Sequence, residues 1–153
     1  MRKRPSARLL VIDPSGKVLL FRFVHERGPL KGQDFWATPG GALEVNETFE
    51  QAAVRELTEE TAIEVSTPGR QVFRREFVLQ LPDGEYVAAD ERYFVIEVTD
   101  SSVSRGGWTS LEREVMRDFK WWSVEELERT TDTVWPNELA MLLQSIVSGL
   151  KGD

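Results

Sequence analysis

The sequence predicts one domain of the α+β class, in which helices cover a mixed β-sheet. The first observation is size: the chain has 153 residues, 41% of them hydrophobic, which suits one domain with a buried core. The second is the order of the elements, in which strands, a helix, further strands and a second helix follow one another, as in a mixed sheet packed against helices. No segment repeats, so we expect a single domain over residues 1–153.

The first part of the chain predicts a hairpin, a loop and a short strand. Two apolar segments, 7–13 and 17–24, flank the turn sequence PSGK and predict a β-hairpin. Residues 25–34 contain glycine, proline and four charges without an apolar period, as in a loop. Residues 35–41, FWATPGG, predict a short strand that breaks at Pro39.

The middle of the chain predicts a helix and two strands. The helix is expected over residues 48–61, within the most acidic part of the sequence. Segments 71–81 and 91–98 alternate between apolar and polar residues and are separated by the turn sequence PDGE. These two segments therefore predict paired strands.

The last part predicts a long loop, a strand and a helix. Residues 99–114 are polar, and a long loop in a compact domain is commonly functional. Residues 119–127 predict a strand that runs into a helical turn with Ser123 as its cap. A final helix is expected from Pro136, with Gly149 just past its end.

Composition excludes several classes of function. A net charge of −7 argues against DNA, RNA or an anionic membrane as the main partner. The absence of cysteine removes disulfides, thiolate nucleophiles and Cys-ligated zinc, and suits the cytoplasm, where we expect the protein. The apolar run 9–12 is too short for a signal peptide, and no segment is long enough for a membrane span.

Most of the negative charge lies in segment 41–63, which holds six glutamates and one arginine. On a helix, Glu56, Glu59 and Glu60 fall within an arc of about 100°. Like charges at this spacing cost about 0.2–0.5 kcal/mol per pair, unless a cation lies between them. A solvated acidic face is the commoner explanation for three glutamates, but a Pro-Gly-Gly turn and Glu47 precede this helix at fixed intervals. Grouped carboxylates of this kind suit Mg²⁺ or Mn²⁺.

The same segment resembles the signature of the Nudix hydrolases, in which Gly, Glu, Arg-Glu, an aliphatic residue, Glu-Glu and a second aliphatic residue recur at fixed intervals. The resemblance extends more weakly to WATPGG before the segment and WWSVEEL after it. It implies an α/β/α sandwich, the Nudix-type fold, with the signature forming a loop, a helix and a loop. The matching positions are Gly41, Glu47, Arg55, Glu56, Leu57, Glu59, Glu60 and Ile63.

The resemblance implies metal-dependent hydrolysis of a nucleoside diphosphate linked to another group, by attack of water on phosphorus. Nucleoside triphosphates and nucleotide sugars both stay open as substrates. The acidic site would repel the anionic diphosphate, and a bound Mg²⁺ or Mn²⁺ would turn this repulsion into attraction. The implied metal ligands are Glu56, Glu59, Glu60 and the backbone carbonyl of Gly40, with Glu56 as general base or as ligand to a second metal.

Some relatives take the general base from a distal loop instead. For this role the sequence offers Glu112 or Glu114, with Asp90 and Glu91 behind them. Glu114 is therefore included in the predicted catalytic set, beside Glu56 and Glu59.

Other residues are expected to support the site. Gly41, Glu47 and Arg55 are predicted to be structural, the last two through a salt bridge between loop and helix. Trp108 follows two glycines and is the best candidate for stacking on a base, although any tryptophan is more often a core residue. His25 is the only histidine, and we expect a loop residue rather than a catalyst.

Two positions depart from the family pattern. Ala62 stands where the signature has Gly, and Asn46 stands where relatives often have Gly. A left-handed conformation at Ala62 would lower the stability by about 1 kcal/mol. Neither position supplies a metal-ligating side chain, so we expect the chemistry to be unaffected. The rival hypothesis is a catalytically inactive nucleotide-binding or regulatory module of the same fold. Dimers are common in the family, so a homodimer also stays open.

Overall fold

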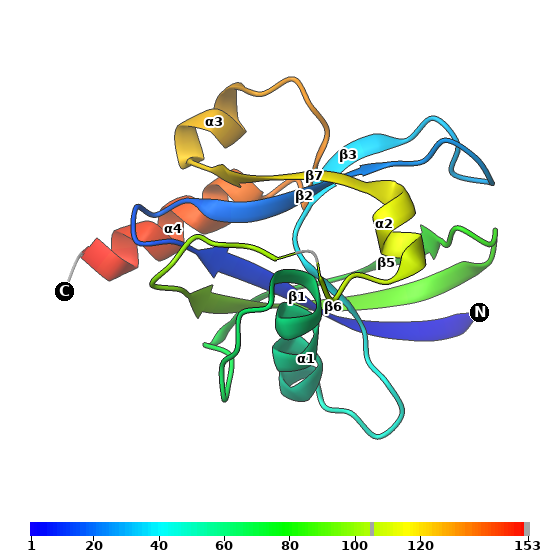
Figure 1. Ribbon diagram of the computed structural model, residues 1–153, viewed down its shortest axis with the longest axis horizontal. Coiled ribbons are helices and arrows are strands. Elements are labelled where there is room, and N and C mark those ends of the chain that lie inside the picture. Colours follow the sequence, from blue (N-terminus) through cyan, green and yellow to red (C-terminus); the bar gives the residue numbers. More distant parts are fainter. Residues whose placement is uncertain (105, 152–153) are drawn as a thin grey trace.

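The computed structural model describes residues 1–104 and 106–151. The first four strands precede the first helix, and strands and helices are mixed in the rest of the chain (Figure 1). The elements are β1 (Arg2–Ile12), β2 (Val18–Val24), β3 (Asp34–Ala37), β4 (Gly40–Ala42), α1 (Phe49–Thr61), β5 (Gln71–Gln80), β6 (Tyr86–Glu97), α2 (Ser110–Val115), β7 (Met116–Trp122), α3 (Val124–Arg129), β8 (Val134–Trp135) and α4 (Leu139–Lys151).

The strands of the described chain form one mixed sheet whose central path runs β5, β6, β1, β2, β3 and β8. Strand β1 pairs in parallel with β6 along its whole length, but with β2 only at Ile12 and Val18, beside the turn. Beyond the turn the two strands separate, and β4 pairs with β1 at Ser6 to Arg8. Figure 1 accordingly shows β2, β3 and β7 in the upper part of the molecule and β1, β5 and β6 in the lower part.

Helices cover both faces of β1, because successive side chains of a strand point to opposite sides. Leu9 belongs to a buried cluster with Leu57 of α1. Its neighbour Leu10 belongs to a second cluster with Leu143 of α4. This arrangement is the expected α/β/α sandwich.

Several boundaries differ from the sequence prediction. The 99–114 loop contains α2, whose capping box at Thr109 and Glu112 begins a helix too short to have an apolar period. Strand β6 starts at Tyr86, well before the predicted 91–98, because its pairing with β1 continues through weakly alternating residues. The final helix starts at Leu139 rather than Pro136 and continues through Gly149. The short strands β4 and β8 were not predicted.

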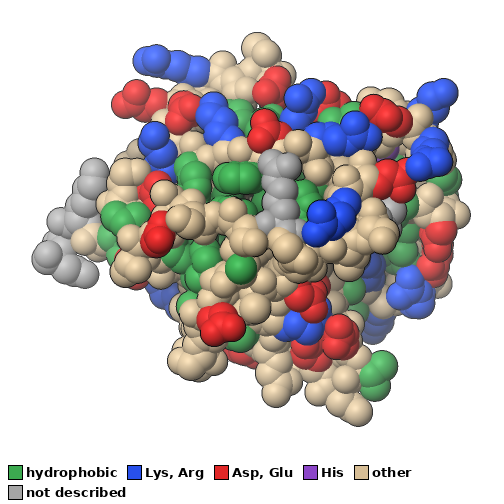
Figure 2. Space-filling model, in the orientation of Figure 1, with side chains coloured by type: hydrophobic (Ala, Val, Ile, Leu, Met, Phe, Trp, Pro, Cys, Tyr) green, Lys and Arg blue, Asp and Glu red, His purple; other side chains and the backbone are tan. Residues whose placement is uncertain are grey.

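No helix of the described chain has both the length and the apolar character needed to cross a bilayer. Figure 2 shows acidic and basic side chains interspersed over one face of the molecule. A mixed surface of this kind contrasts with the concentrated acidity of α1.

Candidate functional site

Helix α1 carries the acidic residues and has well-defined ends. Thr48 caps its first turn: the Thr48 hydroxyl accepts a hydrogen bond from the Gln51 N–H, and the Gln51 side chain accepts one from the Thr48 N–H. At the other end Ala62 adopts the left-handed conformation, with φ of 65°. Asn46, in the loop before the helix, is also left-handed. Both departures from the family pattern therefore fall where glycine would be unstrained.

Three carboxylates meet at the C-terminal half of α1. Oxygen atoms of Glu56, Glu60 and Glu112 lie within 4.8 Å of one another. Glu56 and Glu60 come from successive turns of α1 and are 8% and 2% exposed, whereas Glu112 arrives from α2. We call these three residues the acidic cluster. Buried carboxylates at such distances repel one another unless a proton or a cation lies between them.

The pKa values of two glutamates of α1, Glu59 and Glu60, are raised. Burial and the neighbouring Glu56, with which it shares a hydrogen bond, raise the pKa of Glu60 well above its ordinary value. Burial and Glu56 also raise the pKa of Glu59. A divalent cation would remove this penalty, and the all-oxygen donor set fits Mg²⁺ or Mn²⁺.

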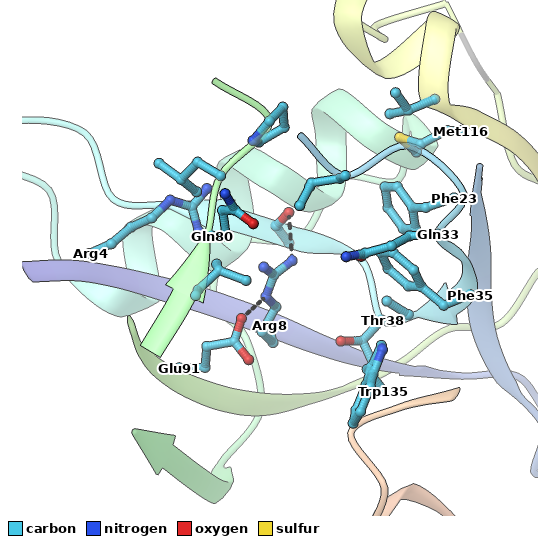
Figure 3. A pocket seen from close by; sticks show the side chains of 18 of the residues that line it. Arg4, Arg8, Phe23, Gln33, Phe35, Thr38, Gln80, Glu91, Met116 and Trp135 are labelled. Atoms are coloured by element: carbon cyan, nitrogen blue, oxygen red, sulfur yellow. Dashed lines mark hydrogen bonds and ion pairs between the residues drawn. The ribbon is translucent and has the colours of Figure 1, made fainter. Parts of the chain in front are cut away.

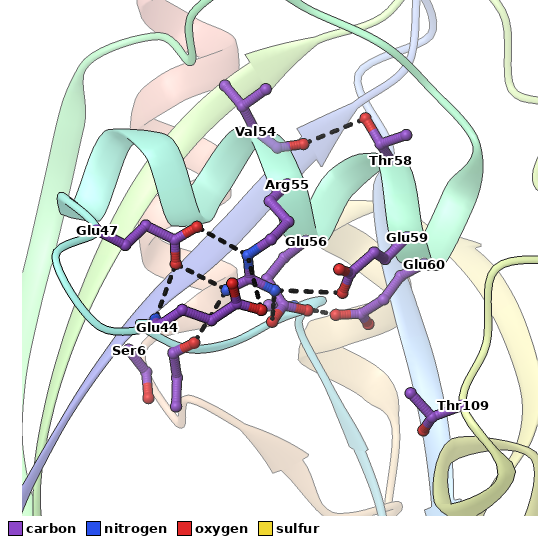
Figure 4. Close-up of polar contacts among 12 residues, drawn as sticks. Ser6, Glu44, Glu47, Val54, Arg55, Glu56, Thr58, Glu59, Glu60 and Thr109 are labelled. Carbon is purple, nitrogen blue, oxygen red and sulfur yellow. Dashed lines mark hydrogen bonds and ion pairs between the residues drawn. The ribbon is translucent and has the colours of Figure 1, made fainter.

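Arg55 connects the acidic residues of the loop and the helix (Figure 4). Its guanidinium donates to Glu47 at 2.8 Å, to Glu56 at 2.9 Å and to Glu59 at 3.2 Å. A further bond, at 3.1 Å, goes to the carbonyl of Ala42 in β4. The expected pair of Glu47 and Arg55 is thus present, and these contacts raise the pKa of Arg55 and lower that of Glu47.

Two glycines at the start of the signature allow close contacts, Gly40 with the backbone of β1 and Gly41 with Glu56. A Cβ on Gly40 would lie 2.1 Å from the carbonyl oxygen of Ala7, and φ at Gly40 is 134°. A Cβ on Gly41 would lie 2.5 Å from a carboxylate oxygen of Glu56. The N–H of Gly40 donates to Glu60 at 3.0 Å, which fixes that side chain beside β4.

Two predicted catalytic residues lie outside the acidic cluster. The side chain of Glu59 is 43% exposed and accepts its hydrogen bond from Arg55. Glu114 does not belong to the cluster and pairs with Arg27 in the loop after β2. The carboxylate that α2 brings to the cluster is Glu112, the alternative candidate from the same loop. The sequence offered no way to choose between them, because the start of α2 decides which residue faces α1.

The structure does not support the stacking role expected of Trp108. Its ring is 6% exposed and packs edge-on against Phe21, with centroids 5.4 Å apart. Its indole N–H donates to the backbone carbonyl of Glu60 at 2.7 Å. Trp108 therefore belongs to the core and attaches the loop before α2 to the last turn of α1. Gly107 permits this approach, since a Cβ there would lie 2.5 Å from the carbonyl oxygen of Glu59.

A cavity of about 490 Å³ opens beside the acidic cluster, between the separated parts of the sheet (Figure 3). Glu60 and Glu112 form part of its wall, and so does Gly40. Sequence reasoning missed its remaining lining, because these residues come from separate strands and loops that share no motif. The apolar side chains that line it include Phe23, Leu30, Phe35, Phe77, Leu79, Met116 and Trp135.

A buried ionic network forms the floor of the cavity. Glu91 accepts hydrogen bonds from Arg8 at 2.7 Å, from Arg75 at 2.9 Å and from the Tyr93 hydroxyl at 3.0 Å. Burial alone would raise the pKa of Glu91, but the charges of the two arginines prevail and lower it. Arg8 also donates to the carbonyl of Gly40 at 3.3 Å. Glu91, expected only as a reserve base, is therefore neutralised by two cations.

Comparison with known proteins identifies the family. A family model of the NUDIX domain matches residues 2–143. The 8-oxo-dGTP diphosphatase of Proteus vulgaris is 54% identical over 46 residues, 29% of this chain and 40% of that protein. The ADP-ribose pyrophosphatase of Methanocaldococcus jannaschii is 34% identical over 94 residues, 53% of each chain. The matches thus take in about half, or less, of these relatives' own length.

Comparison with solved structures identifies the same fold. The MutT protein from Methanosarcina mazei Go1 superposes with a TM-score of 0.69 at 20% identity, over 98% of this chain and 96% of that one. The predicted α/β/α sandwich is confirmed. Because the NUDIX domain model takes in most of the sequence, including the acidic helix and the strands around the cavity, the chain belongs to the Nudix hydrolase family.

Proposed function

We propose that the protein is a pyrophosphohydrolase that uses Mg²⁺ or Mn²⁺ to cleave a nucleoside diphosphate linked to another group. The observation that carries the proposal is that two members of the acidic cluster, Glu60 and Glu112, lie on the wall of the cavity. A nucleotide held in the cavity would present its phosphates to buried carboxylates, and a divalent cation is the partner that makes this contact favourable. The activities named for the two curated relatives support the same reaction class.

In this proposal Glu56, Glu60 and Glu112 would hold the ion, with Glu59 and the carbonyl of Gly40 as the further ligands that the resemblance implies. The chemistry that a bound divalent ion supplies is polarisation of phosphoryl oxygens and activation of water. Glu56 or Glu112 takes the proton of the attacking water, since both carboxylates face the same space. The hydrogen bonds of Arg55 hold Glu56 in place and leave it little freedom to rotate.

The apolar part of the cavity would hold the nucleoside. Phe23 and Phe35 lie stacked, with ring centroids 5.4 Å apart, and form a flat surface on one side. Aromatic surfaces of this kind bind bases without a strict sequence preference. The inactive nucleotide-binding module stays the second candidate, but its function would not require a buried carboxylate cluster at the edge of the cavity.

Turnover of a substrate panel tests the proposal. Nucleoside triphosphates, damaged triphosphates and nucleotide sugars are incubated with Mg²⁺, Mn²⁺ or chelator, and released phosphate, pyrophosphate or nucleoside monophosphate is measured. We expect turnover that requires the metal and that Glu60→Gln nearly abolishes. Glu50→Gln is the matched control, since Glu50 is an exposed glutamate in the first turn of the same helix.

Two results would count against the proposal. A parent protein that binds nucleotides but turns over none of them with either metal would favour the inactive module. Equal turnover by Glu60→Gln and Glu50→Gln would remove the acidic cluster from the reaction.

A further inference from the structure

Arg4 lies on the wall of the cavity, on the same face of β1 as Arg8. Figure 3 shows Arg4 on the side of Gln80, with Phe23, Phe35 and Trp135 on the opposite side. Arg8, which donates to the carbonyl of Gly40, lies between these two sides. A ligand that stacks on the aromatic rings and passes Arg8 would therefore reach Arg4.

Arg4 differs from the other partly buried arginines of the described chain in its lack of a counterion. It is partly buried, and within residues 1–104 and 106–151 no carboxylate forms an ion pair with it. Its guanidinium donates to the Ser6 hydroxyl at 3.1 Å, a neutral acceptor. The other partly buried arginines of the described chain each lie within 4 Å of a carboxylate oxygen; they are Arg8, Arg22, Arg55, Arg75 and Arg92.

The nearby charges do not compensate Arg4. Glu91, the carboxylate whose charge acts most strongly on Arg4, is already shared by Arg8 and Arg75. Burial, together with repulsion from Arg8, lowers the pKa of Arg4. A guanidinium in such a position gains most from an anionic ligand that accepts several of its hydrogen bonds, and phosphate matches its planar donor geometry.

We infer that Arg4 binds a phosphate group of the substrate beyond the bond that is cleaved, and that the site therefore prefers nucleoside triphosphates to nucleotide sugars. This inference rests on the proposed function. In a nucleotide sugar both phosphates flank the cleaved bond and the outer group is an uncharged sugar. A triphosphate carries an additional ionised phosphate, which is the group that an uncompensated guanidinium attracts.

Kinetics with substrates of both classes test the preference. The variants are Arg4→Gln, Arg4→Lys and, as matched control, Arg2→Gln, because Arg2 lies on the same strand but is exposed and paired with Glu85. We expect Arg4→Gln to lower kcat/KM for a triphosphate about tenfold or more, chiefly through KM, because a charge-assisted hydrogen bond is lost. A nucleotide sugar such as UDP-glucose should be affected much less, and Arg4→Lys should recover part of the loss. Arg2→Gln should match the parent.

Binding of inorganic pyrophosphate in the presence of Mg²⁺ gives a second readout that does not depend on turnover. Calorimetry should show weaker binding by Arg4→Gln than by Arg2→Gln, at unchanged melting temperature. Equal pyrophosphate affinity in these two variants, or an equal loss of kcat/KM for triphosphate and sugar substrates, would overturn the inference. Failure of the proposed function would look different, because the parent itself would then turn over no substrate with either metal.

Discussion

At the scale of single residues, Glu112 and Glu114 offer a direct comparison. They lie two positions apart on α2, but Glu112 joins the acidic cluster and Glu114 pairs with Arg27. We expect Glu112→Gln to lower kcat on the order of 100-fold, as for loss of a catalytic or ligating carboxylate, and Glu114→Gln to stay close to the parent. Steady-state kinetics with Mg²⁺ measures both, and the reverse ranking would restore Glu114 as the distal base.

Glu91 predicts a specific dependence of stability on pH. Its pKa is lowered below the ordinary 4.5 in the folded protein, so between the two pKa values the unfolded chain binds more protons. The stabilisation is therefore complete above about pH 4.5 and is lost as the pH falls through the folded pKa. At pH 7, Glu91→Gln should lower the free energy of unfolding by about 3 kcal/mol, since it leaves two arginines without their carboxylate.

Urea unfolding of the parent and Glu91→Gln, at pH values from 7 down to 3, measures this difference. The difference between the free energies of unfolding of the two proteins should decrease as the pH falls. A constant gap would show that the variant loses packing rather than an ion pair.

Some residues of the site could be predicted from the sequence and others could not, for a physical reason. The glutamates of α1 were found because one helix fixes their spacing, and the structure places Glu56 and Glu60 together as that spacing requires. Glu112 reaches the same place through tertiary contacts of a loop, and Arg4 faces the cavity because β1 and β2 separate. Neither relation leaves a pattern in the sequence.

At the scale of elements, the end of α1 carries a removable strain. Ala62 is left-handed there and keeps the helix-ending hydrogen bond from its N–H to the Thr58 carbonyl. We expect Ala62→Gly to raise the free energy of unfolding by about 1 kcal/mol and the melting temperature by roughly 2–4 °C, with turnover intact. Ala53→Gly, in the interior of the same helix, is the control and should change stability in the opposite direction. A large loss of activity in Ala62→Gly would contradict this expectation.

The loop before α2 is hydrogen-bonded to backbone carbonyls in the last turn of α1. Trp108 donates to the carbonyl of Glu60 at 2.7 Å, and the N–H of Ser104 donates to the carbonyl of Thr61 at 3.0 Å. Trp108→Phe keeps an aromatic side chain but loses the indole N–H, which leaves the Glu60 carbonyl without this donor, so we expect a loss of about 2 kcal/mol in unfolding free energy. Because the loop leads into α2, kcat should fall while KM for the nucleotide changes little.

Denaturant unfolding and kinetics together distinguish this anchoring role from base stacking. A stacking tryptophan would show the opposite result, with a raised KM and unchanged stability. The predicted helix 48–61 and the strand before Ser123 were found from local periods and caps, whereas this contact joins segments 48 residues apart. Such contacts depend on packing, which periodicity does not encode.

At the scale of the whole molecule, the acidic cluster joins two helices that β5 and β6 separate along the chain. Glu56 and Glu60 belong to α1 and Glu112 to α2, so an ion bound by all three would crosslink these elements in the folded state alone. Ligands that bind only the folded protein stabilise it by mass action, by about 2.7 kcal/mol at 100 times Kd. We therefore expect Mg²⁺ to raise the melting temperature of the parent above its value in chelator.

The single substitutions separate this effect from general salt effects. Glu60→Gln and Glu112→Gln should each lose most of the Mg²⁺-dependent rise, although they lie on different elements, whereas Glu114→Gln should keep it. In chelator Glu60→Gln should be at least as stable as the parent, because it removes one of two repelling buried carboxylates. Differential scanning calorimetry with Mg²⁺, chelator and matched ionic strength makes the comparison. An equal rise in all four proteins would mean that the ion acts elsewhere, and the link between cation, cavity and the two helices would then fail.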